Sequence, residues 1–152
     1  MTEVPDVMAR FRCAFAGLED RVELRGGADH VAYMAGYREI DVSLDPYPHA
    51  GGVSSLESLW MGVPVITRTG ELPVSRLTAT MLRQLDLGRL ITTIEASYVK
   101  LASMIRHDPA WLAHVRATLR ADFKKSILWG DNWARAVYGE MRDRWREWCR
   151  RA

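Results

Sequence analysis

Two adjacent glycines, Gly51 and Gly52, open a segment whose residue types are suited to binding a phosphate. They follow the run Ile40–Asp45, in which apolar and polar residues alternate, and Ser54 and Glu57 come shortly after them. A helix beginning behind the glycines presents unpaired N–H groups and the positive end of its dipole to an anion. The glycines carry no Cβ and so allow close approach of a ligand to the backbone. A Ser54 hydroxyl and a Glu57 carboxylate then suit a phosphate and a ribose.

The same residues also match a purely structural pattern. Ser54 and Glu57 stand at the S-x-x-E spacing of a capping box, in which both side chains bond the backbone of their own helix. A single glycine pair is not a dinucleotide-binding fingerprint, and the phosphate-loop pattern G-x-x-x-x-G-K-[ST] does not occur in the chain. The residue pattern by itself therefore leaves a capped helix and a ligand site both open.

Other residue types that often do chemistry lack a telling arrangement. No metal-ligand spacing joins the four histidines, His30, His49, His107 and His114, and no metal is expected. Asp41 and Asp45 bracket a predicted strand and are interpreted as turn residues at its ends, an acid/base pair being the alternative. Ser75 and Arg76 begin a predicted helix, where Arg76 is either solvated or part of a structural ion pair.

Short strands and helices alternate along the chain. Strands are predicted at 21–25, 40–45, 64–67 and 89–93, and helices at 5–16, 30–38, 53–61, 74–85 and 94–107, with two more behind Asp108-Pro109 and Asp131. Thr92 and Glu95 form a second predicted capping box. The alternation predicts the α/β class, a Rossmann-like three-layer domain with a short parallel sheet followed by C-terminal helices.

Length and composition bound the class of protein. The 152 residues suit one domain, 48% of them are hydrophobic, and the net charge of +2 is too small to indicate a nucleic-acid partner. No segment approaches the roughly 20 apolar residues of a membrane span. Cys13 and Cys149 form no disulfide framework or metal motif, so we expect a reducing, cytoplasmic location.

The C-terminal region is rich in tryptophan. Five of the six tryptophans lie after residue 110, which indicates that this region packs on another surface. An apolar stripe at helical spacing starts at Val137 and continues into the tail "MRDRWREWCRR" through Met141, Trp145 and Trp148. We expect a docking helix with a charged outer face, and an exposed stripe would favour a homo-oligomer.

Longer motifs resemble a known family. The run "DVSLDPYPHAGGVSSLESLWMGVPVIT" followed by "GELPVSRL" closely resembles the C-terminal catalytic half of the O-linked N-acetylglucosamine transferase (SPINDLY-type) family. "HVAYMAGYREID" and "SILWGDNWARAVYGEMRDRW" support the resemblance, which extends from about Arg21 to Trp148. It implies the second, donor-binding domain of a GT-B glycosyltransferase. The whole chain, 1–152, is thus expected to be one nucleotide-sugar-binding domain truncated on its N-terminal side, with 94–152 as a helical region packing on it.

The resemblance also implies a ligand, UDP or UDP-GlcNAc, and protein Ser/Thr hydroxyls as acceptors. By position, Gly52, Val53 and Ser54 would contact the diphosphate next to Gly51, and Glu57 would hold the ribose. The loop "GGADH", with Gly27, Ala28 and His30, would border the uracil, and Tyr33 stands where members often carry histidine. No cofactor or metal is expected besides the donor substrate, and neither a nucleic-acid nor a membrane partner.

Departures from the family pattern limit the expected activity. Val53 replaces the first threonine of a T-T pair, which removes one hydroxyl from the phosphate shell. The family's upstream lysine and its N-terminal catalytic half have no counterpart in this sequence. We therefore expect the chain alone to bind donor weakly and to show negligible transferase activity, with the other half as a possible partner. Two rival hypotheses remain: a non-catalytic remnant that acts as an interaction module, and a simple UDP-binding domain.

Overall fold

The computed structural model describes residues 5–151 of the chain. It divides into two compact units, residues 1–36 and residues 37–152, which we call the N-terminal unit and the sheet unit. The expectation of one domain over 1–152 stays a prediction.

The described residues of the N-terminal unit form two helices, α1 (Pro5–Ala14) and α2 (His30–Gly36). The strand predicted at 21–25 is wrong, because that segment is irregular and the described part of this unit contains no strand. An alternating apolar and charged run becomes a strand only when its N–H and C=O groups find a partner. The stretch instead contains a local ion pair, with Arg25 Nε 2.8 Å from Glu23 Oε1.

The sheet unit is built on three parallel strands in the order β1 (Ser43–Leu44), β2 (Val65–Arg68) and β3 (Ile91–Thr92). Ser43 is opposite Val65, and Thr67 is opposite Ile91. The central strand β2 is buried over its first three residues, as a parallel strand covered on both faces requires. The predicted α/β class with a short parallel sheet is confirmed.

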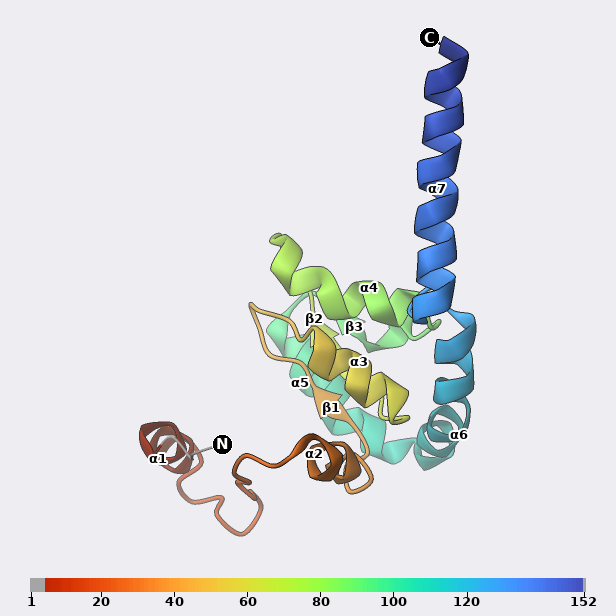
Figure 1. The fold of residues 1–152 in the computed structure, drawn as a ribbon. Coiled ribbons are helices and arrows are strands. Elements are labelled where there is room, and N and C mark those ends of the chain that lie inside the picture. The colour runs from red at the N-terminus through yellow and green to blue at the C-terminus, as the bar shows by residue number, and fades with distance from the viewer. Residues whose placement is uncertain (1–4, 152) are drawn as a thin grey trace. The chain divides into compact units, whose positions relative to one another are not determined.

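Helices connect and cover these strands (Figure 1). α3 (Val53–Trp60) links β1 to β2, and the 3₁₀ turn η1 (Pro73–Arg76) with α4 (Leu77–Arg83) and the 3₁₀ turn η2 (Gly88–Leu90) link β2 to β3. α5 (Glu95–Met104), the 3₁₀ turn η3 (Ile105–His107), α6 (Pro109–Lys125) and α7 (Gly130–Arg151) follow β3. α3, α4 and α5 all contact β2.

Only one of the predicted caps in the C-terminal half forms. Asp108 caps α6, its carboxylate accepting the Trp111 N–H at 3.2 Å, with Pro109 at the first helical position. The Thr92–Glu95 capping box is wrong: Thr92 Oγ1 donates to the Thr67 carbonyl at 3.0 Å, and Glu95 pairs with Arg68 at 3.2 Å. The cap predicted at Asp131 is also wrong, because α7 already begins at Gly130.

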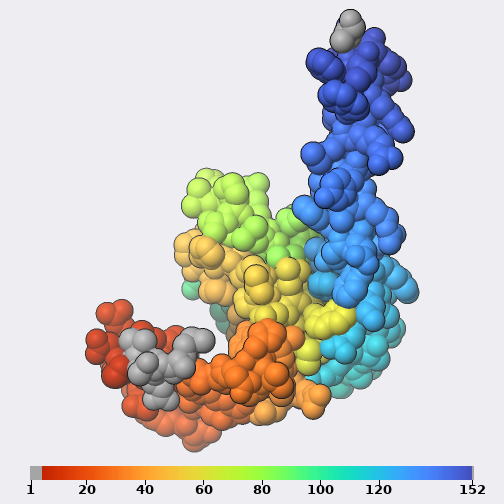
Figure 2. Space-filling model, in the orientation of Figure 1, coloured from red at the N-terminus to blue at the C-terminus, as the bar shows by residue number. Residues whose placement is uncertain are grey.

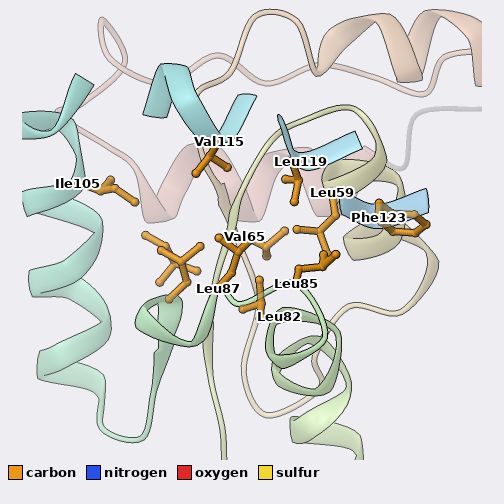
Figure 3. Close-up of a cluster of buried hydrophobic side chains, with 11 residues drawn as sticks. Leu59, Val65, Leu82, Leu85, Leu87, Ile105, Val115, Leu119 and Phe123 are labelled. Carbon is orange, nitrogen blue, oxygen red and sulfur yellow. The ribbon is translucent and has the colours of Figure 1, made fainter. Parts of the chain in front are cut away.

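The hydrophobic core joins the sheet to the helices on it (Figure 3). Leu59 of α3, Val65 of β2 and Leu82 of α4 face Val115 and its helical neighbours on α6. The α6 residues in this cluster, Val115, Leu119 and Phe123, recur every four residues, so one face of the helix is buried. Each fully buried leucine in such a core contributes about 2 kcal/mol.

An aromatic cluster attaches α6 to the end of α3. The Trp60 ring stacks on Trp129 at 5.4 Å between centroids and meets Phe123 edge-on at 5.7 Å. The Arg120 guanidinium lies 4.6 Å from the Trp60 ring centroid, and its Nε donates to the Trp60 carbonyl at 2.9 Å. Three contact types thus act on one side chain, which makes Trp60 the anchor between these helices.

α7 is the longest of the described helices, with 22 residues, and none of its residues is buried. It extends away from the sheet in Figures 1 and 2. Its large apolar side chains are exposed, namely Trp133, Tyr138, Met141, Trp145 and Trp148. Trp145 and Trp148 stack on each other at 5.3 Å. No helix in residues 5–151 is both long enough and apolar enough to cross a membrane.

Candidate functional site

The loop between β1 and α3 leaves the carboxyl end of the sheet, where ligands of open parallel sheets bind. Asp45, at the end of β1, is only 4% exposed. Its Oδ1 accepts the Gly51 N–H at 2.6 Å, and its Oδ2 accepts the Thr67 hydroxyl at 2.6 Å. Asp45 therefore ties the glycine loop to the central strand. The interpretation of Asp45 as a simple turn residue missed this role.

Gly51 is also held through its carbonyl. Thr78 Oγ1 donates to the Gly51 carbonyl at 3.1 Å, and Ser55 Oγ lies 2.9 Å from the same threonine oxygen. Thr78 has one hydroxyl proton, which the carbonyl uses, so Ser55 must be the donor to Thr78. Ser55 is buried and serves the loop, not a ligand.

The capping box predicted at Ser54 and Glu57 is not formed. α3 begins at Val53 with Gly52 at the N-cap, and this N-cap residue makes no side-chain cap hydrogen bond. Ser54 is thus the second helical residue, two positions too late to cap the helix. The first turn of α3 keeps the N–H groups that an α-helix cannot satisfy internally, and it contains no acidic residue.

The side chains around this helix start leave it open. A Cβ on Gly52 would meet no described atom within 4 Å, and Val53 is 70% exposed. The Ser54 side chain is exposed, and the Ser54 carbonyl accepts the Tyr37 hydroxyl at 3.2 Å. Glu57 is half-buried one turn further along. The predicted residues Gly51, Gly52, Val53, Ser54 and Glu57 thus lie together at one helix start, with Gly51 as its fixed base.

The remaining predicted site residues belong to the N-terminal unit. Gly27 and Ala28 lie in an exposed irregular segment, and His30 is the first residue of α2. Asp29 caps that helix, its Oδ1 accepting the Ala32 N–H at 2.9 Å. The Tyr33 side chain is exposed on α2. Their assignment to the uracil stays a prediction.

One cavity of the sheet unit lies beside this helix start, and a larger one lies elsewhere in the unit. One of about 190 Å³ lies between β1 and α3 and includes Asp45, Ser54 and Ser55 in its lining. Another of about 570 Å³ is lined by Leu44 of β1 and by residues of α5 and α6, and none of the predicted site residues lines it. Pockets for small molecules usually span about 300–1,000 Å³, so the first is too small for a nucleotide-sugar. A ligand at α3 would therefore bind on an open surface.

Tyr98 of α5 also holds the loop between β1 and α3, through the backbone of Asp45. Its hydroxyl donates to the Asp45 carbonyl at 3.0 Å. Burial raises the pKa of the Tyr98 phenol above its ordinary value, and the negative charge of Asp45 raises that pKa further. Sequence reasoning missed Tyr98 because 53 positions separate it from Asp45.

Ser75 and Arg76 shape the loop after β2. Ser75 Oγ accepts the Gly70 N–H at 3.0 Å and donates to the Leu72 carbonyl at 2.7 Å. Arg76 Nε donates to the Gly70 carbonyl at 2.8 Å. A Cβ on Gly70 would lie 2.9 Å from the Tyr47 hydroxyl, so this loop packs on the one that precedes Gly51. Arg76 therefore holds the backbone of a neighbouring loop through a hydrogen bond.

The histidines and acidic residues show no converging arrangement. His49 Nδ1 bonds the adjacent Ala50 carbonyl at 3.0 Å, and His107 Nε2 accepts from Arg106 Nε at 3.1 Å. Among the described residues, no group of three or more His, Cys, Asp or Glu could hold a metal ion. Asp41 lines the cavity between β1, α5 and α6, whereas Asp45 lines the cavity between β1 and α3, so the two carboxylates do not meet at one site.

Known proteins resemble both the sequence and the fold. The profile of glycosyl transferase family 41 matches residues 24–134. The probable UDP-N-acetylglucosamine–peptide N-acetylglucosaminyltransferase SPINDLY of Oryza sativa subsp. japonica is 36% identical over 118 residues, which cover 77% of this chain and 13% of that protein. The corresponding Arabidopsis thaliana protein is 31% identical over 119 residues, 78% of this chain and 13% of its own length.

A solved structure extends the likeness to three dimensions. A mutant O-GlcNAc transferase of Thermobaculum terrenum matches with a TM-score of 0.80 and 31% sequence identity. The match covers 94% of this chain and 28% of that one. The chain thus spans about 13% of the length of the plant relatives and about 28% of the bacterial structure. The resemblance and the fold class predicted from the motifs are confirmed. The chain belongs to glycosyl transferase family 41.

Proposed function

We propose that the start of α3 binds the diphosphate of a UDP-sugar, as the donor-binding part of a GT-B, protein O-GlcNAc-type glycosyltransferase. One observation carries the proposal: α3 begins at the carboxyl edge of the sheet with a glycine at its N-cap, and its first two residues, Val53 and Ser54, are exposed. A phosphate at such an end gains hydrogen bonds from free N–H groups and a favourable dipole. Glu57, one turn along, would accept bonds from the ribose hydroxyls.

The relatives' names support the identity of the ligand. The plant and bacterial proteins are named for transfer of N-acetylglucosamine, from UDP-N-acetylglucosamine to a peptide in the plant case. UDP-GlcNAc is therefore the proposed donor and a protein hydroxyl the proposed acceptor in the complete enzyme, acting in the cytoplasm. Gly27, Ala28, His30 and Tyr33 are proposed to border the uracil. No metal or cofactor is part of the proposal.

Titration calorimetry with UDP and with UDP-GlcNAc tests the proposal. The wild-type chain is expected to bind both. Ser54→Ala and Glu57→Ala are each expected to weaken UDP binding about tenfold, because a hydrogen bond to a charged or ribose group is lost. Ser103→Ala is the matched control, since its exposed hydroxyl bonds the Val99 carbonyl near the carboxyl end of α5, away from the carboxyl edge of the sheet. Equal UDP affinity in all four proteins would remove α3 as the site.

A second function, an interaction module that forms a homo-oligomer, is favoured by α7. Its aromatic side chains Trp133, Tyr138, Trp145 and Trp148 are exposed over a 22-residue helix. Exposed apolar patches of this kind mark protein-protein contacts. This function is compatible with donor binding, because α7 and the start of α3 share no residue.

A further inference from the structure

Gly51 is held at both its N–H and its carbonyl by two side chains, Asp45 at the end of β1 and Thr78 of α4. We propose that Asp45 is a positioning residue for the UDP site, acting with Thr78 to fix Gly51 so that the next amides face the diphosphate. The inference rests on the proposed function of α3. Neither Asp45 nor Thr78 is assigned a contact with the ligand.

Asp45 supplies the first half of this arrangement. The carboxylate accepts the Gly51 N–H at 2.6 Å and the Thr67 hydroxyl at 2.6 Å, so both of its oxygens are engaged. The Asp45 carbonyl in turn accepts the Tyr98 hydroxyl at 3.0 Å. One buried residue thus connects β1, β2, α5 and the glycine loop. Because the Gly51 N–H donates to Asp45, the ligand would accept hydrogen bonds from the backbone N–H groups that follow Gly51.

Thr78 supplies the second half. It lies on α4 and is fully buried, and it donates to the Gly51 carbonyl at 3.1 Å while Ser55 donates to its oxygen. Fixing both the N–H and the C=O of one residue fixes the orientation of both of its peptide planes. The plane that follows Gly51 carries the Gly52 N–H and leads directly into α3. A loop without these bonds would have to be ordered by the ligand, which lowers affinity.

The space around the two glycines also indicates that Gly51 is held by the protein and that Gly52 faces the ligand. A Cβ on Gly51 would overlap Ser55 Oγ and lie 3.1 Å from Asp45 Oδ1. A Cβ on Gly52 would meet no described atom within 4 Å. Gly51 is therefore enclosed by the residues that hold it, whereas Gly52 faces outward, where a ligand can approach.

The test compares UDP affinity, melting temperature and the Gly51 amide signal among matched variants. Asp45→Ala removes both acceptors, Asp45→Asn keeps one acceptor oxygen, Thr78→Val removes the hydroxyl, and Thr78→Ser restores it. Ser58→Ala is the control. Ser58 lies in α3 toward its carboxyl end, and its buried hydroxyl bonds the Ser43 hydroxyl at 2.7 Å and the Val63 carbonyl at 3.0 Å.

We expect Asp45→Ala and Thr78→Val to raise the UDP dissociation constant about tenfold or more, Asp45→Asn to raise it less, and Thr78→Ser to match the wild type. Asp45→Ala should also abolish the hydrogen-exchange protection of the Gly51 amide in ¹⁵N spectra. Ser58→Ala should lower the melting temperature while leaving the UDP affinity and the Gly51 amide unchanged. A change in affinity at comparable stability separates positioning from general destabilisation.

Two outcomes would overturn the inference, and they are distinguishable. If the wild type binds UDP and the folded Thr78→Val and Asp45→Asn variants bind it equally well, the positioning role is wrong and the proposed function stands. If the wild type does not bind UDP at millimolar ligand, the proposed function fails and the positioning role fails with it. Should Asp45→Ala not fold, the Thr78→Val and Thr78→Ser pair decides alone.

Discussion

The Tyr98 hydroxyl donates to the backbone carbonyl of Asp45 at 3.0 Å, which joins α5 to the end of β1. The two residues are 53 positions apart. Asp45 is the first residue of the loop that leads from β1 to the start of α3, so the C-terminal part of the chain helps to order the proposed donor site. The protonation state of Tyr98 is therefore linked to the stability of the sheet unit.

Stability should fall at alkaline pH because of Tyr98. Its pKa in the folded chain is raised above the ordinary value of about 10, mainly by burial and further by Asp45. The folded state thus holds the proton more tightly than the unfolded state does. The contribution of Tyr98 to the free energy of unfolding is fully present below about pH 10, and it is lost as the pH rises through the pKa of the folded state.

The measurement is the urea midpoint of the wild type and of Tyr98→Phe from about pH 8 to about pH 11. Tyr98→Phe should be less stable by about 1 kcal/mol near neutral pH, because the bond to the Asp45 carbonyl is lost. The difference between the two proteins should shrink above about pH 10. A difference that stays constant over the whole range would contradict the raised pKa.

The adjacent glycines should respond differently to alanine. Gly51→Ala places a methyl group against Ser55 Oγ and should lower the free energy of unfolding by about 1–3 kcal/mol. Gly52→Ala has space and should cost less than about 1 kcal/mol. Denaturant unfolding checks both values, and a Gly51→Ala protein as stable as wild type would refute the enclosed position.

UDP affinity adds a second comparison for the same glycines. Gly52→Ala should weaken UDP binding at nearly unchanged stability, because the added methyl group separates the ligand from the backbone. Gly51→Ala should lower both the UDP affinity and the free energy of unfolding. Undiminished UDP binding by Gly52→Ala would argue against close approach of a phosphate at this helix start.

Trp60 should be an important residue for the packing of α6 on α3. Trp60→Ala removes the stacking on Trp129, the edge contact with Phe123 and the surface covered by Arg120. We expect a loss of about 3 kcal/mol in the free energy of unfolding, measured with urea. Trp133→Ala is the control: its side chain is 57% exposed, so a change within about 0.5 kcal/mol is expected. Equal losses in both variants would contradict the anchoring role.

Self-association should depend on the exposed aromatic side chains of α7. We expect sedimentation velocity to show a concentration-dependent oligomer for the wild type. Replacing Trp145 and Trp148 together with glutamate should shift the chain toward monomer, because a charged stripe opposes apolar association. Arg142→Glu, on the charged part of the same helix, serves as a matched change of charge. A wild-type chain that is monomeric at every concentration would exclude the homo-oligomer.

Local sequence signals identified most of the elements of the sheet unit. α3 was predicted at 53–61 and spans Val53–Trp60, bounded by Gly52 on one side and by Gly62 and Pro64 on the other. Asp108 and Pro109 marked the start of α6 correctly. Such signals depend on the backbone preferences of glycine and proline and on caps within one turn, which neighbouring residues decide by themselves.

Side-chain partners between distant segments were not predictable in the same way. Thr92 and Glu95 match a capping box, yet their partners in the folded chain are Thr67 and Arg68 of the adjacent strand. The segment 21–25 has a strand pattern but finds no strand to pair with among the described residues of its unit. In both cases a local preference met a tertiary environment that supplied other partners, or none.

The proposed donor site likewise combines features set by neighbouring residues with contacts between distant segments. The sequence by itself determined the family through its long central motif, and it determined that a glycine pair precedes a helix carrying Ser54 and Glu57. Only the tertiary structure decided that this helix begins at Val53 with a glycine at its N-cap and that Gly51 is held by Asp45 and Thr78. The reason is physical: each polar group takes the partner that the fold brings within about 3 Å, and those partners come from elements far apart in the chain.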